Sequence, residues 1–145
     1  MRVYIIYSII IDNSKVREHF KEGWNMSKDE IAKYVREEAK AWQQYREIQE
    51  KNLPRIRELK RTVLCMKLDA AECYRLSSEY FTLPEVSSAY TQKAVERQQE
   101  AACIEEDIEV LKSEIRSART YAMAMNAVIA TMVAEEEKRK YEEEE

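Results

Sequence analysis

Apolar residues in the second half of the chain recur at alternating spacings of three and four residues. This spacing keeps one stripe of side chains on one face of an α-helix and is typical of helices that pack in a coiled coil. The pattern predicts a helix over about 84–140. Its stripe contains Ala101, Ile104, Ile108, Leu111, Ile115, Ala118, Ala122, Met125, Ile129 and Met132.

The first half of the chain keeps the same rhythm and predicts a helix over about 28–80. Polar Gln49 and Asn52 lie in its stripe beside Pro54, and such polar members cost stability but fix register. A proline inside a helix removes a hydrogen bond and clashes with the preceding turn. Because the repeat keeps its phase across Pro54, we expect a kink there rather than a break. The stripe contains Trp42, Tyr45, Gln49, Asn52, Ile56, Leu59, Val63, Met66, Ala70, Cys73, Ser77 and Tyr80.

Two helix-start patterns divide the chain into these two arms. Each is a capping box, in which two side chains bond each other's backbone donors, flanked by two apolar residues. The members are Met26, Ser27, Glu30 and Ile31 in the first, and Phe81, Thr82, Glu85 and Val86 in the second. The short turn at 81–84 forces the arms to run antiparallel, with facing residue numbers that sum to about 165. The sequence therefore predicts an all-α, coiled-coil-like antiparallel helical hairpin, with its first arm kinked or broken near Pro54.

The composition supports this fold class. Gly23 is the only glycine, and Pro54 and Pro84 are the only prolines. Strand-rich domains need such residues at their turns. We therefore expect one helical domain over 26–145, ending in a charged tail.

Residues 1–25 do not fit this pattern. The apolar run 3–11 could be a buried strand, but no partner strand is evident for its backbone groups. Lys21, Glu22 and Gly23 back-translate to a purine-rich string resembling a bacterial ribosome-binding site, followed by a start-like sequence at Met26. One hypothesis is that Met26 is the native initiator and that 1–25 is a translated leader.

Charge patterning supports the hairpin register. At a sum of about 165, the basic stretch 51–61 lies along the acidic stretch 105–114, so we expect its charges to be neutralised within the hairpin. The alternative is that 51–61 binds nucleic acid by releasing counterions from phosphate. The formal net charge of −4 argues against that alternative.

Hydrophobicity exceeds what two helices can bury at one end of the hairpin. The segment 121–134 is apolar almost all round, and such helices are buried all round. Either residues 1–25 fold back over this segment, or a second chain covers it. We expect a homo-oligomer, with a dimer completing a helical bundle. The candidate interface is Tyr121, Met123, Met125, Val128, Ile129 and Met132.

Aromatic residues gather at the predicted turn, namely Tyr74, Tyr80, Phe81 and Tyr90. We favour mutual packing that closes the loop. The functional interpretation is an aromatic anchor for a partner, because tyrosine is enriched in binding hot spots.

Catalytic chemistry is not indicated. The single histidine, His19, lies in the doubtful leader, and Cys65, Cys73 and Cys103 lack metal-ligand spacing. We expect no enzyme, cofactor or metal, no membrane span and a cytoplasmic location. The prediction is a self-associating helical interaction protein that binds or blocks a protein partner. The start-like sequence at Met26 suggests a bacterial or phage accessory protein, such as an inhibitor.

Overall fold

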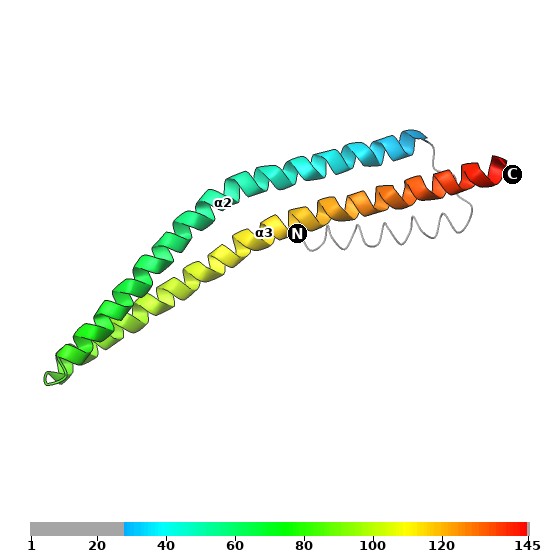
Figure 1. The fold of residues 1–145 in the computed structure, drawn as a ribbon. Helices are drawn as coiled ribbons and strands as arrows, with labels where there is room; N and C mark the ends of the chain where they lie inside the picture. The colour runs from blue at the N-terminus through cyan, green and yellow to red at the C-terminus, as the bar shows by residue number, and fades with distance from the viewer. Residues whose placement is uncertain (1–27, 145) are drawn as a thin grey trace. The chain divides into compact units, whose positions relative to one another are not determined.

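Two helices make up the computed structural model, which describes residues 28–144. Helix α2 spans Lys28–Glu79 and helix α3 spans Pro84–Glu144. They lie side by side and are joined by the short turn at 80–83 (Figure 1). The predicted all-α antiparallel hairpin is confirmed. Its completion into a bundle by self-association stays a prediction.

Helix α2 continues through Pro54 without a break. The apolar stripe keeps its phase there, so packing on both sides of the proline offsets the lost backbone hydrogen bond. The predicted leader over 1–25, the start at Met26 and the Ser27 capping box lie outside the described residues.

The chain forms two compact units, each containing a part of both helices. Unit 2 is Lys51–Ser113 and includes the turn. Within the described residues, unit 1 consists of 28–50 from α2 and 114–144 from α3.

Unit 1 is held together partly by residues of the predicted α3 stripe and partly by residues outside both predicted stripes. Val128 and Met132 are buried and pack against partly buried Ile31 and Tyr34. Glu38 joins the two helices, since its Oε1 accepts hydrogen bonds from Asn126 Nδ2 at 3.0 Å and from Trp42 Nε1 at 3.2 Å. The buried apolar residues of this unit are Ala41, Ala122, Met125, Val128 and Met132.

Unit 2 has a seam of small and branched side chains. Ala70, Cys73 and Ala94 form one buried cluster between the helices. Asn52 is 3% exposed and donates through Nδ2 to the Leu111 carbonyl at 3.2 Å. Small side chains bring the two helix axes close together, which increases dispersion contacts along the seam. The other buried members are Ile56, Val63, Ala101 and Ile108.

The register agrees with the predicted one. Contacts join Glu38 to Asn126, Asn52 to Leu111 and Ser77 to Ser87, and in each pair the residue numbers sum to within two of 165. Trp42 packs edge-on against Tyr45, with ring centroids 5.9 Å apart. The sulfur–aromatic contacts expected between Trp42 or Tyr45 and Met123 or Met125 stay a prediction.

Candidate partner-binding surfaces

The turn between the helices is tight and well hydrogen-bonded. Tyr80 N donates to the Leu76 carbonyl at 3.0 Å, and Leu83 N donates to the Tyr80 carbonyl at 2.9 Å. The first bond of α3 runs from Ser87 N to the Leu83 carbonyl at 2.9 Å. Leu83 is therefore the N-cap, and Pro84 takes the first helical position, where its missing N–H costs nothing.

The capping box predicted at Thr82 is wrong. Among the hydrogen bonds of the described residues, none joins Thr82 to Glu85, because α3 begins one residue later than that motif requires. Proline pre-set for the first turn supplies the start signal instead.

A cluster of hydroxyl groups ties the two helices together just behind the turn. Ser77 Oγ lies 2.9 Å from the Ser87 carbonyl, 3.0 Å from Ser87 Oγ and 2.6 Å from Thr91 Oγ1. In return, Ser87 Oγ donates to the Ser77 carbonyl at 2.9 Å. We call Ser77, Ser87 and Thr91 the hydroxyl clasp. These hydrogen bonds fix the two helix ends next to each other at the turn.

The aromatic residues at the turn behave in two ways. Tyr80 and Tyr90 stack with centroids 5.9 Å apart and an interplanar angle of 16°. Tyr74 is hydrogen-bonded through its hydroxyl to Gln98 Oε1 at 3.1 Å. Of the four, the stacked pair Tyr80 and Tyr90 follows the loop-closing interpretation, in which the aromatic residues pack on one another. Phe81 does not, because it is 76% exposed.

Phe81 is the centre of an exposed apolar patch. Leu83 is 52% exposed, and Tyr80 and Val86 are also exposed. We call Tyr80, Phe81, Leu83 and Val86 the tip patch. The sequence pattern alone predicts that Phe81 packs with the other aromatic residues of the turn, and it does not indicate Leu83.

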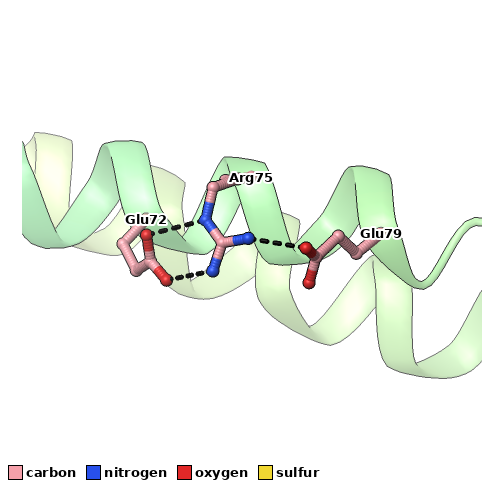
Figure 2. Close-up of polar contacts among 3 residues, drawn as sticks. All are labelled: Glu72, Arg75 and Glu79. Atoms are coloured by element: carbon pink, nitrogen blue, oxygen red, sulfur yellow. Dashed lines mark hydrogen bonds and ion pairs between the residues drawn. The ribbon is translucent and has the colours of Figure 1, made fainter.

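An exposed ion-pair group lies on the last turns of α2 before the tip. Figure 2 shows Arg75 between Glu72 and Glu79, with Arg75 Nε donating to Glu72 Oε2 at 2.9 Å and NH1 donating to Glu79 at 2.6 Å. The hydrogen bonds from Arg75 hold the pKa of Glu72 below its ordinary value of 4.5, and the same bonds raise the pKa of Arg75. Solvent around these exposed side chains screens the attraction, so it orders side chains more than it stabilises the fold.

The interface predicted in segment 121–134 is largely internal. Met125, Val128 and Met132 are buried within the chain, and Tyr121 and Ile129 are half-buried. Met123 alone among the six candidates is strongly exposed, at 53%. The surface available to a partner here is therefore much smaller than the sequence suggested.

The basic stretch 51–61 is less neutralised than expected. Arg55 pairs with Glu58 on its own helix at 3.1 Å. Lys51, Arg57, Lys60 and Arg61 are exposed and make no ion pair with any described residue. The acidic stretch does lie alongside, as the hydrogen bond from Asn52 to the Leu111 carbonyl shows. The expected neutralisation of 51–61 is therefore not seen in these four side chains.

Exposed side chains away from the seam complete the surface of unit 2. Leu64, Leu68 and Val110 are exposed, as are Cys65 and Cys103, whereas Cys73 is buried. Within residues 28–144, no group of three or more histidine, cysteine or acidic side chains is placed to hold a metal ion. In the same range, neither helix has a stretch apolar enough to cross a bilayer.

Comparisons with known proteins give no further guide. No family model, no curated protein and no solved structure matches the chain.

Proposed function

We propose that this chain is a non-enzymatic helical interaction protein that self-associates and docks its tip patch into a protein partner. The observation that carries the proposal is the exposure of Phe81 at the end of a hairpin whose turn is fixed by the hydroxyl clasp. A large aromatic side chain on a hydrogen-bonded turn loses little conformational entropy when it binds a partner. Such side chains are therefore favoured as binding hot spots.

The distribution of perturbed titratable groups supports a non-enzymatic role. Active sites gather groups with shifted pKa in clefts. Here the pKa of Glu72 is lowered and those of Arg75 and Arg97 are raised, first by hydrogen bonds within exposed guanidinium–carboxylate pairs. Such pairs are solvated surface features.

In one form of this proposal, the chain is a bacterial or phage accessory protein that blocks a target. The hairpin tip would then act as the blocking element, inserted into an apolar recess of the target enzyme.

Site-specific photo-crosslinking tests the tip patch. A benzophenone side chain introduced at Phe81 is compared, in cells of the natural source, with the same group at Val110. Val110 is a matched control because it is 58% exposed and also lies in unit 2. We expect one discrete adduct from position 81 and none from position 110.

A second variant tests whether the crosslinked adduct depends on the tip patch. Leu83→Ser in the position-81 chain removes a flanking apolar contact and should reduce the yield at least ~5-fold, since hot-spot truncations cost ~1 kcal/mol or more. Equal labelling from positions 81 and 110, or an adduct indifferent to Leu83→Ser, would contradict docking through the tip.

The second candidate function is nucleic-acid association through 51–61. The observation favouring it is the set of exposed basic side chains without ion pairs among the described residues, Lys51, Arg57, Lys60 and Arg61. Affinity for an oligonucleotide should then fall steeply with salt, and Arg57→Glu with Arg61→Glu should abolish it while leaving the fold intact.

A further inference from the structure

One lateral face of unit 2 combines exposed apolar surface with opposite charge on its two helices. On α2, spacings of three and four place Arg57, Lys60, Leu64 and Lys67 on one side. The ion pair from Lys67 Nζ to Glu105 Oε1, at 2.6 Å, shows which side of α3 adjoins it. We call this side the lateral face.

The α3 part of the lateral face is acidic and contains a shallow depression. Ala102, Glu105 and Glu109 follow the same spacing on this side of α3. The depression measures about 280 Å³ and is lined by Lys67, Gln98, Ala101, Ala102 and Glu105. Small-molecule sites span ~300–1,000 Å³ and are deeper and more apolar, so this hollow better suits a single protruding side chain.

Leu64 is such a side chain. It is 58% exposed and stands on the α2 edge of the lateral face. The register sets Leu64 level with Ala101 of α3, because facing residue numbers sum to about 165. The protrusion and the hollow therefore lie at one height, on opposite helices of the same face.

Two-fold symmetry brings these complementary features together in one orientation. In a symmetric dimer each copy presents the same patch. A two-fold axis parallel to the helices sets α2 of one copy over α3 of the other, at equal height and with both tips at one end. A two-fold axis perpendicular to the helices instead sets α2 of one copy on α2 of the other. Arg57 and Lys60 of one copy would then face the same basic residues of the other copy.

Charge favours the first orientation. Between 51 and 68, α2 has six basic residues and one acidic residue, whereas between 98 and 112, α3 has five acidic residues and one basic residue. We infer that a second copy of this chain docks on the lateral face with both tips at one end, inserting Leu64 of each copy into the hollow over Ala101 and Ala102 of the other. This inference rests on the self-association part of the proposed function. Two tip patches side by side would bind a repeated target with avidity.

Light-scattering mass against concentration tests the interface with a matched pair of variants. Leu64→Glu introduces an acidic group above acidic Glu105 and should weaken the dimer at least ~10-fold. Val110→Glu should leave the dimer intact. Val110 is equally exposed but lies one residue, or about 100°, round α3 from Glu109, away from the lateral face.

Charge reversal gives a test that misfolding cannot imitate. One chain has Arg57→Glu with Lys60→Glu, and another has Glu105→Lys with Glu109→Lys. Each alone should be monomeric, and their equimolar mixture should recover the dimer. Failure of the mixture to recover it overturns the inference, as does a Leu64→Glu chain that still dimerises. A strictly monomeric wild-type chain at micromolar concentration overturns both the inference and the self-association proposal.

Spin labels distinguish the two orientations. Thr82→Cys is labelled in a chain with Cys65→Ser and Cys103→Ser, because the remaining Cys73 is buried. With both tips at one end the labels should lie within ~25 Å, given interaxial distances of 8–10 Å. The opposed orientation would separate them by ~50 Å, since about 18 helical residues lie between Leu64 and the tip in each copy, and would overturn the inference. A third outcome would favour nucleic acid. In it, reversal of Arg57 and Lys60 abolishes oligonucleotide binding, while reversal of Glu105 and Glu109 leaves the light-scattering mass of the chain unchanged. That outcome would overturn the inference of a dimer.

Discussion

Asn52 shows how one polar residue in an apolar seam can set the pairing of two helices. Its side chain is buried, and its Nδ2 reaches the Leu111 carbonyl of the other helix. That carbonyl also belongs to the backbone ladder of α3, so the asparagine adds a bond without completing an unsatisfied group. A slip in register would leave the buried amide without a partner, which is costly. Its polar position in the stripe was visible in the sequence.

Replacing this amide should therefore raise stability. Asn52→Leu removes the hydrogen bond to the Leu111 carbonyl but buries a side chain of similar size that has no polar atoms. We expect the free energy of unfolding to rise by about 1 kcal/mol, the difference between apolar burial and a net hydrogen bond. Urea denaturation measures it. Asn52→Ala, which leaves a cavity, is the control and should be destabilising. A loss of stability in Asn52→Leu would show that the hydrogen bond outweighs burial.

The exposed pair Glu72–Arg75 has a defined response to pH. Hydrogen bonds from Arg75 lower the pKa of Glu72 below its ordinary 4.5. The stabilisation it contributes is therefore present above pH 4.5 and is lost as the pH falls through the lowered pKa. Carboxyl NMR titration should give Glu72 a midpoint below 4.5, and Arg75→Gln should return it towards that value.

The control for that titration is Glu79→Gln. Glu79 bonds Arg75 but does not contribute to the Glu72 shift, so the Glu72 midpoint should stay low. A midpoint unmoved by Arg75→Gln would show that the pair does not persist in solution.

At the scale of the helices, the alternation of threes and fours located the seam of α3 from Ala101 onwards. Every predicted α3 stripe residue from Ala101 to Met132 is buried or half-buried. The stripe also continues towards the turn through Ser87, Tyr90, Ala94 and Arg97. Three of these four residues are polar, so the apolar pattern is interrupted there. The sequence pattern therefore did not predict this extension of the stripe.

The hydroxyl clasp is the element-scale feature with the clearest energetic consequence. Ser77→Ala removes the group that joins α2 to Ser87 and Thr91. Net hydrogen bonds are worth about 1 kcal/mol each, so we expect a fall in Tm of about 3–6 °C for a chain of this size. Circular dichroism on heating measures it. Ser78→Ala is the adjacent control, because Ser78 is exposed. Equal Tm values for the two variants would show that the clasp contributes nothing.

At the scale of the molecule, the exposed surface of unit 2 concentrates features that the seam does not use. The tip patch occupies the turn, and the lateral face lies along the two helices between 57 and 109. Docking a second copy on the lateral face would leave both tip patches free for a partner. Self-association and partner binding are therefore compatible in one assembly.

The sequence by itself determined the fold class, the ends of both helices to within a few residues, the register and the polar member of the seam. Each of these follows from local periodicity, because residues three and four apart share a helix face whatever surrounds them. Only the tertiary structure decided which surplus apolar residues are buried. It placed Val128, which lies off the predicted stripe, inside and left Phe81, Leu64 and Val110 outside. Exposure depends on how closely two helices approach and where a turn points its side chains, and both are set by contacts between residues far apart in the chain.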